Sequence, residues 1–532
     1  MIEVEVHQQL RAFLREQGEP YWPHHLTMAR LVARALRLGR SALIQAGPPS
    51  GDRGRYRLSY LASALIWSEP VVLVASESLQ QRLLMVEIPR LQQWIQTPKA
   101  IQIGDCWPYA GFQGLLMVTP DIWLADRLGE QKRFPEGIPV ILDGVDDLET
   151  WTRDRMTASL HPGDWDALML ACPAHSAAIL DVRAHLMQSI FQHPASPYEC
   201  CLLEASEQDS LHYLYQELNS SSIETELSSP DPIAKANATV PHVEEYKTLP
   251  TSWQKFWRYF QAEGQLLWAR IARRQGQFSL HCAPIDISIP LQSVWTQQPV
   301  VLIGGALDLE STAPTYRQRI GLEDLTCVKF PPDRQSELIQ LYLPDGLPMP
   351  NTPQFQAALV QQIRELLSAS LGVQGLTAIL VSDMPLQAQL ASILASEFGS
   401  RVQVEKTCLD DNGILVTGWE FWQQHQGVLP APHLLAIATL PIPSLENPLV
   451  AGRVNHYKRL HQDWFRLYLL PEALTRLQRA IAPIRECQGT VALFDNRVIH
   501  RSYGKQVLAA LSPLARSNYF DPSLLVENNP QP

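Results

Sequence analysis

The sequence predicts an α/β protein with two parallel sheets, each covered by helices on both faces, and a mostly helical segment between them. Short apolar runs rich in Val, Ile and Leu alternate with helical patterns, which is typical of parallel strands buried on both sides. At 532 residues the chain is long enough for about three domains, each with its own core. A hydrophobic share of 46% and a charged share of 18% indicate an ordinary globular protein.

Two groups of apolar runs supply the predicted strands. The strands expected in the first sheet are residues 42–44, 71–75, 115–119, 140–143 and, after a long interruption, 300–303. Those expected in the second sheet are residues 377–381, 414–417, 434–440 and 491–495. Two α/β sheets in one chain is the simplest account of this order.

The segment between the two groups has helical periodicity and few strand-like runs. Within it, a stretch rich in Ser, Pro and Ala and lacking aromatic residues predicts a flexible loop. The expected organisation is a first domain at 1–148, a helical insertion at 149–279 with the loop at 219–243, a return to the first domain at 280–345, a second domain at 346–520, and a disordered tail at 521–532.

Charge and cysteine usage narrow the function classes. The net charge of -11 argues against a broad basic surface for non-specific nucleic-acid binding, although a local groove can still hold a strand. The N-terminus has no apolar core of a signal peptide, and no apolar run approaches 18 residues, so no membrane segment is expected. The eight cysteines lack the short paired spacings of a zinc site, which favours a reducing cytoplasm.

The C-terminal part of the chain carries a series of widely spaced motif residues. They are Pro471, Ala473, Gln478, Ile484, Arg485, Asp495, Arg497, Tyr503 and Gly504. In this order they resemble the end of the XPD/DinG branch of superfamily 2 DNA helicases, which reads LPxA, then QxxGRxIR, then DxR and finally YG. Ile481 and Ala482 stand where the family has Gly-Arg. The resemblance implies that the family's Arg, which this chain lacks, reaches the γ-phosphate of a bound nucleotide.

The segment after residues 42–44 stands where a phosphate loop belongs. A working loop has GxxxxGK[ST], because backbone N–H groups cradle the phosphates, the Lys neutralises them and the hydroxyl holds Mg²⁺. Gly47, Ser50 and Gly51 match the family's loop, but Asp52 falls on the Lys. Shifting the register restores a cation at Arg55 without restoring the hydroxyl.

Two further segments resemble family motifs with their acidic or catalytic positions altered. Residues 140–149, VILDGVDDLE, match a DEAHNLE segment in which Asp143 can still face Mg²⁺. Gly144 replaces the Glu that would activate the attacking water. Phe421 and Trp422 match a family segment that reads SFWEGVDLPG, and we expect both to contact nucleic acid.

The resemblance implies ATP and Mg²⁺ as cofactors, which the altered positions put in question. Asp143, Gln478 and Arg485 are the remnants of the catalytic site that it would carry over. The family often holds an iron–sulfur cluster on four cysteines before the DEAH segment. This chain has only Cys106 in that interval, so we expect no cluster.

Two groups of cationic residues are candidates for holding a nucleic-acid strand. Arg30 and Arg34 belong to a stripe at helical spacing, which equally describes a solvated helix face. Trp257 and Arg258 belong to an aromatic and cationic cluster of the kind that binds single strands. Aromatic residues at helical spacing more often form a core, and we favour that interpretation.

These observations predict two RecA-like domains of the P-loop NTPase type and a degenerate relative of DinG-type helicases. The expected function is binding to single-stranded DNA, another nucleic acid or a DNA-repair protein, with ATP hydrolysis weak or lost. The alternative is an active ATP-dependent helicase with Arg55 as substitute cation. A structural partner that binds no nucleic acid is the third possibility.

Overall fold

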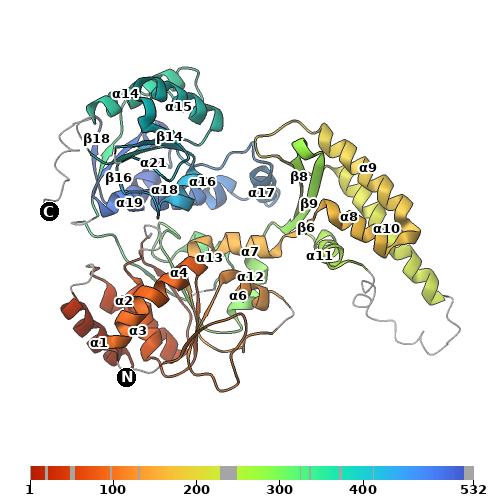
Figure 1. The fold of residues 1–532 in the computed structure, drawn as a ribbon, viewed down its shortest axis with the longest axis horizontal. Helices are drawn as coiled ribbons and strands as arrows, with labels where there is room; N and C mark the ends of the chain where they lie inside the picture. Colours follow the sequence, from red (N-terminus) through yellow and green to blue (C-terminus); the bar gives the residue numbers. More distant parts are fainter. Residues whose placement is uncertain are drawn as a thin grey trace. The chain divides into compact units, whose positions relative to one another are not determined.

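The computed structural model describes residues 2–17, 22–47, 54–95, 99–129, 132–227, 249–323, 325–334, 337–370, 374–410 and 412–519. The chain, drawn in Figure 1, divides into two compact units. The first comprises Met1–Trp151, Ser288–Ile442 and Phe465–Pro532, and the second comprises Thr152–Ile287 and Pro443–Trp464. The phosphate-loop candidates Ser50 and Gly51, together with Asp52, lie outside the described residues, as do the predicted tail and most of the predicted loop.

The first sheet of unit one has seven parallel strands in the order β11-β1-β10-β5-β2-β4-β3. Their bounds are β1 Ala42–Gln45, β2 Val71–Val74, β3 Ile101–Ile103, β4 Leu115–Val118, β5 Val140–Asp143, β10 Val300–Gly304 and β11 Thr326–Lys329. The strand that follows the long insertion, β10, therefore lies between β1 and β5. All five strands expected from the sequence are present, and β3 and β11, which were not expected, are the edge strands.

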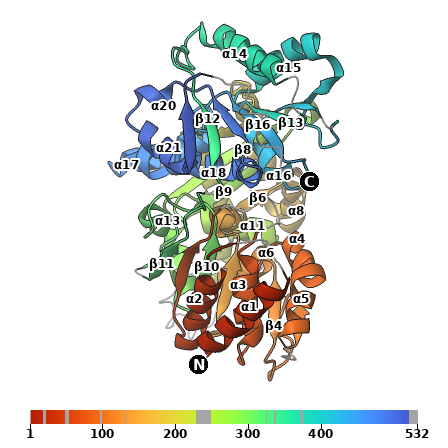
Figure 2. The ribbon, with the colours of Figure 1, turned by 90° about the vertical axis from the view of Figure 1, so that its left-hand side faces the viewer.

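Helices cover both faces of this sheet. On one face lie α1 Ile2–Gln17, α2 His25–Leu38 and α3 Arg57–Ile66, which pack side by side (Figure 2) and share one apolar core with the strands. Further along the chain are α4 Glu77–Arg82, a π-helical turn Leu83–Glu87, α5 Ile88–Trp94, α6 Pro120–Arg127, α7 Leu148–Met156, α12 Ser288–Trp295 and α13 Pro314–Arg319. Trp123 of α6 stacks with Trp295 of α12, with ring centroids 6.5 Å apart.

The second sheet of unit one is also parallel, in the order β14-β15-β13-β16-β17-β12-β18. Its strands are β12 Ile339–Tyr342, β13 Leu376–Leu380, β14 Val402–Val404, β15 Ile414–Thr417, β16 Pro432–Ile437, β17 Thr490–Leu493 and β18 Leu514–Ser517. Because β12 joins this sheet, the first sheet's part of the chain ends before residue 339 and not at 345 as expected from the sequence.

Alternate side chains of these strands belong to two separate cores, one on each face of the sheet. In β13, Ala378 and Leu380 belong to one core, whereas Ile379 belongs to the other, which it shares with α14 Phe355–Ala369 and α15 Met384–Phe398. This alternation is the pattern of a strand buried on both sides.

Two layers of helices enclose the second sheet, as Figure 1 shows. One layer consists of α14 and α15. The core on the opposite face is covered by α16 Trp419–His425, a π-helical turn Phe465–Leu469, α18 Leu470–Ala480, α19 Ala482–Glu486, α20 Arg497–His500 and α21 Gly504–Leu511.

Unit two contains a sheet that was not expected from the sequence. The predicted helical insertion at 149–279 does contain α8 Pro162–Ala171, α9 Ser176–Gln192, α10 Ala205–Leu227 and α11 Thr251–Phe260. It also contributes most of a four-stranded antiparallel sheet in the order β6-β9-β8-β7, from β6 Ala158–Leu160, β7 Cys200–Leu202, β8 Gln265–Ala272 and β9 Gln277–Pro284. Two of these strands have three residues each, too few for a recognisable alternation.

Two boundaries in unit two also differ from expectation. Helix α10 continues to Leu227, into the segment 219–243 for which a flexible loop is predicted. Residues 443–464, expected in the second domain, fold with unit two, where α17 Pro448–Arg459 packs on the sheet through Leu449 and Gly452.

No single helix in the described part of the chain is long and apolar enough to cross a bilayer. One bent pair, Pro162–Ala171 with Pro173–Gln192, reaches the required length and composition, with an angle of 112° between its two parts.

The fold predicts that the Gly of the YG motif is required for packing. A Cβ atom on Gly504 would lie 1.8 Å from the carbonyl oxygen of Val498, which is backbone and cannot turn away. We expect Gly504→Ala to lower the free energy of unfolding by about 1–3 kcal/mol. Gly163→Ala is the matched control, because nothing lies within 4 Å of its Cβ position. Equal denaturant midpoints for the two variants would contradict the packing assigned to Gly504.

Candidate nucleotide site

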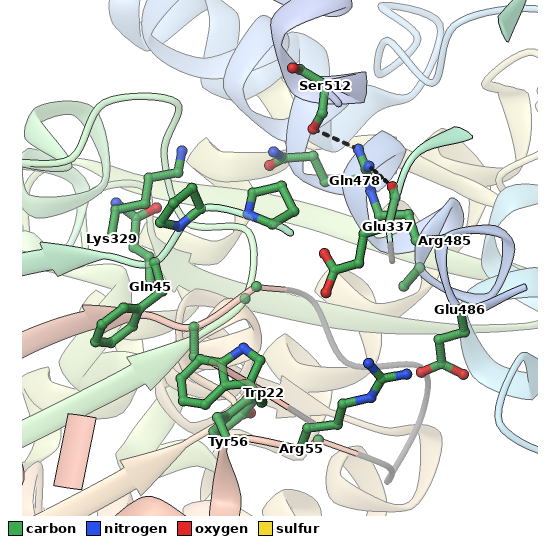
Figure 3. A pocket seen from close by; sticks show the side chains of 18 of the residues that line it. Trp22, Gln45, Arg55, Tyr56, Lys329, Glu337, Gln478, Arg485, Glu486 and Ser512 are labelled. Atoms are coloured by element: carbon green, nitrogen blue, oxygen red, sulfur yellow. Dashed lines mark hydrogen bonds between the residues drawn. The ribbon is translucent and has the colours of Figure 1, made fainter. Parts of the chain in front are cut away.

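A pocket opens at the carboxyl ends of β1, β10 and β11, where ligands of parallel α/β sheets usually bind. Its volume is about 150 Å³. Both sheets of unit one contribute to its wall. The lining residues from the first sheet's side include Trp22, Gln45, Ala46, Gly47, Gly54, Arg55, Tyr56, Gly305, Lys329 and Phe330, and those from the second include Gln478, Ala482, Arg485, Glu486 and Ser512 (Figure 3).

The predicted phosphate-loop residues on either side of the undescribed stretch line this pocket. Gly47 has a φ of +87°, a left-handed conformation that suits glycine. Arg55, the candidate substitute cation, extends into the pocket on the side of Glu337 and Glu486 (Figure 3). The second lining cation, Lys329, donates to the carbonyl oxygens of Asp308 and Leu309 at 2.7 and 2.8 Å.

The carboxylate of Asp143, at the end of β5, is enclosed by three donors. The hydroxyl of Tyr56 donates to Oδ1 at 2.7 Å, and the hydroxyl of Tyr60 donates to Oδ2 at 2.8 Å. Nε of Arg57 donates to Oδ2 at 3.1 Å, in an ion pair whose side chains are 5% and 0% exposed. We call these four residues the Asp143 cluster.

The three donors of the Asp143 cluster come from one short segment of the chain. Tyr56 and Tyr60 are four residues apart at the start of α3, so both side chains lie on one face, and Arg57 reaches the same carboxylate. Burial, followed by the negative charge of Asp143, raises the pKa of both tyrosines well above the ordinary value, so both hydroxyls stay protonated as donors.

The residues present at Asp143 do not fit a Mg²⁺ ion. Magnesium requires octahedral oxygen ligands and usually keeps several waters, whereas both oxygens of Asp143 already accept hydrogen bonds in a buried position. The guanidinium of Arg57 supplies the positive charge that would otherwise come from a metal. Among the described residues, no group of three or more His, Cys, Asp or Glu side chains is placed to hold a metal ion.

The position after Asp143 has a backbone that disfavours the family's Glu. Gly144 has φ +86° and ψ +32°, a left-handed conformation that costs other residues about 1–2 kcal/mol. The following turn is fixed by Asp146, whose carboxylate accepts the N–H groups of Gly305 and Ala306 at 2.8 and 2.6 Å. Burial raises the pKa of Asp146, although Arg479 and these two donors act in the opposite direction.

The candidate residues of the QxxGRxIR segment have different surroundings. Gln478 and Ala482 line the pocket, so a methyl group stands where the family's first Arg would be. Arg485 is buried, and its two terminal nitrogens donate to the carbonyl oxygens of Glu337, Leu511, Ser512 and Pro513 at 2.7–3.4 Å. Burial lowers its pKa to about 10, despite the nearby Glu337. Arg485 therefore connects the backbone segments that precede β12 and β18.

Comparison with known proteins adds sequence and fold relatives. The chain is 23% identical over 253 residues to the ATP-dependent DNA helicase YoaA of Escherichia coli, and 24% identical over 257 residues to its namesake in Haemophilus influenzae. Each match covers 45% of this chain and 40% of the relative, so it spans less than half of either protein. No family model matches the chain.

Solved structures agree with this fold. An XPD helicase matches 94% of this chain and 100% of its own, with a TM-score of 0.56 at 11% identity. Xpd4 of S. tokodaii matches 93% of this chain and 100% of its own, with a TM-score of 0.57 at 10% identity. The chain therefore has the fold of XPD helicases, and part of it is similar in sequence to YoaA.

Within this XPD-like fold, two of the aromatic residues predicted to contact nucleic acid are buried. Trp257 is fully buried in the core of unit two, where its ring lies 5.2 Å from that of Trp253. Trp422 is fully buried in unit one and donates through Nε1 to the carbonyl oxygen of Ala480 at 3.0 Å. Neither ring presents a face to solvent, so the core interpretation of these aromatic residues replaces the stacking one.

The other four candidates for nucleic-acid contact are at least partly accessible. Arg30 and Arg34 are exposed on α2, opposite the face that packs on the sheet. Arg258 is exposed on α11 of unit two. Phe421 is half-buried and stacks on His425 with ring centroids 4.2 Å apart.

Three residues of this site, Tyr56, Arg57 and Tyr60, were not predicted from the sequence. They belong to the segment that directly follows the altered phosphate loop. Comparison with the family motif points to residues of the loop and not to those that follow it. The available signal was their spacing, because two tyrosines four residues apart with a cation between them can present three donors together.

Breaking the Asp143 cluster is expected to destabilise the fold strongly. Arg57→Ala leaves the buried carboxylate without its cation, which typically costs about 3–5 kcal/mol in unfolding free energy. Asp166→Ala, which removes an exposed partner of Arg183, is the control and is expected to cost about 0–1 kcal/mol. Chemical denaturation compares the two. A stability loss for Arg57→Ala no larger than that of the control would show that the ion pair is not needed.

Proposed function

We propose that this XPD/DinG-like chain binds nucleic acid or a DNA-repair partner without coupling that binding to ATP hydrolysis. The observation that carries the proposal is the Asp143 cluster. In it, Arg57 and two tyrosine hydroxyls donate hydrogen bonds to the carboxylate that would face Mg²⁺ in a working site. Without that metal, the charge of a triphosphate has no divalent partner at this position.

Two other positions support the same proposal. Hydrolysis needs a group that orients and deprotonates water, and the left-handed Gly144 offers no side chain for it. Charge that develops on the γ-phosphate needs a cation, and Ala482 offers only a methyl group. Because such groups act together, restoring one of them leaves the others missing.

The proposed ligand is single-stranded DNA or another nucleic acid. The sequence relatives are named as DNA helicases, and Arg30 and Arg34 form an exposed pair one helical turn apart on α2. Such a pair contacts phosphates irrespective of sequence. We also propose that the chain acts in the cytoplasm, because the spacings of its eight cysteines fit a reducing compartment.

One observation keeps an active helicase as the second candidate. Arg55 lines the pocket and extends into it, where it could neutralise a phosphate in place of the usual Lys (Figure 3). Its neighbours Glu337 and Glu486 oppose this role, because two carboxylates beside a triphosphate are repulsive at short range.

The proposal predicts no DNA-stimulated ATP turnover above background. The measurement is steady-state phosphate release under saturating ATP, Mg²⁺ and single-stranded DNA. Turnover of about 1 per second, an ordinary enzyme rate, that survives further purification and disappears in Arg55→Ala would establish the active-helicase alternative.

A second prediction concerns the nucleic-acid surface. Arg34→Glu should weaken binding to single-stranded DNA and reduce the slope of log K against log salt by about 0.7 for each phosphate that Arg34 neutralises. Arg516→Glu makes the same change of charge at an exposed position of β18 and is the control. Fluorescence anisotropy at several salt concentrations measures both. Equal affinities for the two variants would remove α2 from the binding surface, and absence of binding by the unaltered chain would favour a purely structural partner.

A further inference from the structure

Three hydrogen bonds connect the two sheets of unit one beside the pocket. Arg479 of α18 donates through Nη1 to Oδ1 of Asp147 at 2.6 Å and through Nη2 to Oδ2 at 3.2 Å. Thr475, one turn earlier on α18, donates through Oγ1 to the carbonyl oxygen of Ala306 at 2.8 Å. We call Asp147, Ala306, Thr475 and Arg479 the inter-sheet clasp.

Both ends of the clasp belong to segments that make further contacts of their own. On the first sheet's side, Asp147 ends the turn that Asp146 ties to the backbone N–H groups that follow β10. On the second sheet's side, Thr475 and Arg479 are four residues apart on α18, whose other face is buried through Leu474 and Leu477. The bidentate ion pair and the hydroxyl contact therefore join two fixed points.

The clasp is made entirely of the chain's own groups. The side chains of Arg479 and Asp147 are 26% and 41% exposed, so the ion pair is accessible to solvent. Its two parallel hydrogen bonds nevertheless fix the relative orientation of the guanidinium and the carboxylate. No nucleotide phosphate or metal is required to bridge it. The Asp143 cluster, whose carboxylate is at the end of β5 just before the turn that carries Asp147, is likewise complete without one.

We propose that the inter-sheet clasp keeps the two sheets of unit one closed on each other in the absence of nucleotide. A surface built from both sheets would then be assembled permanently, and its affinity for a ligand would not depend on ATP. The last consequence rests on the proposed function, whereas the closure itself does not.

The test measures the distance between the two sheets directly. Cys106, between β3 and β4, and Cys408, between β14 and β15, are exposed natural thiols, and the other six cysteines are half-buried or buried. Limited labelling of these two sites with a donor and an acceptor dye allows single-molecule energy transfer on the full chain. We expect one narrow distribution that ADP, ATP and a non-hydrolysable ATP analogue leave unchanged.

Three variants separate the clasp from other causes. Asp147→Ala and Arg479→Ala should each broaden the distribution toward longer distances, and the charge-exchanged double variant Asp147→Arg with Arg479→Asp should narrow it again. Glu397→Ala is the matched control, because it breaks the Arg364–Glu397 ion pair within the second sheet's helices at similar exposure, 40% and 34%. The control should leave the distribution unaltered.

Each outcome bears on the proposal. Unchanged distances in both single clasp variants, with circular dichroism showing an intact fold, would overturn it. A distribution that is broad in the unaltered chain and narrows only with nucleotide would also overturn it. ATP turnover measured on the same preparations tests the proposed function separately, because hydrolysis can be absent whether or not the clasp holds.

Discussion

The ion pair between Arg57 and Asp143 is the interaction on which the character of the candidate site depends. It lies at the carboxyl end of the central strand β5, between the segment that follows the phosphate loop and the turn that contacts the end of β10. Two buried charges are stable only when they are paired and hydrogen-bonded, and the hydroxyls of Tyr56 and Tyr60 complete that requirement. The same arrangement stabilises the fold and, under the proposed function, leaves the carboxylate of Asp143 without a metal ion.

The surrounding residues are physically consistent with this arrangement. Because Asp143 is neutralised from within, a catalytic Glu at the next position would have no metal-bound phosphate to serve, and Gly144 there adopts a left-handed conformation suited to glycine. Asp146 turns its carboxylate to backbone N–H groups, and Arg485 turns its guanidinium to backbone carbonyls. These charged side chains near the pocket therefore stabilise the fold.

The fold and the position of the site could be predicted from the sequence where strands are apolar and buried on both faces. Residues 42–44 and 140–143 are of this kind, and they form β1 and β5 of one parallel sheet. The three-residue strands β6 and β7 were missed because they are too short to show an alternation of apolar and polar residues. They form only by pairing with strands distant in the sequence, β6 with β9 and β7 with β8.

The details of the site could not be predicted, because Tyr56 and Tyr60 reach Asp143 across more than 80 positions of the chain. The helical spacing of aromatic residues likewise does not show which face of the helix is exposed to solvent. Only their burial in the structure shows that Trp257 and Trp422 are core residues.

The dependence of ATP affinity on magnesium tests directly whether Arg57 stands in place of a metal ion at Asp143. Binding of ATP to the full chain would be measured by isothermal titration, once with Mg²⁺ and once with a chelator, alongside Asp143→Asn. We expect the affinity for ATP, whether weak or absent, to be the same with and without Mg²⁺, because the guanidinium of Arg57 already pairs with the carboxylate of Asp143. A Mg²⁺-dependent gain of about tenfold or more, equivalent to about 1.4 kcal/mol, that Asp143→Asn abolishes would contradict it.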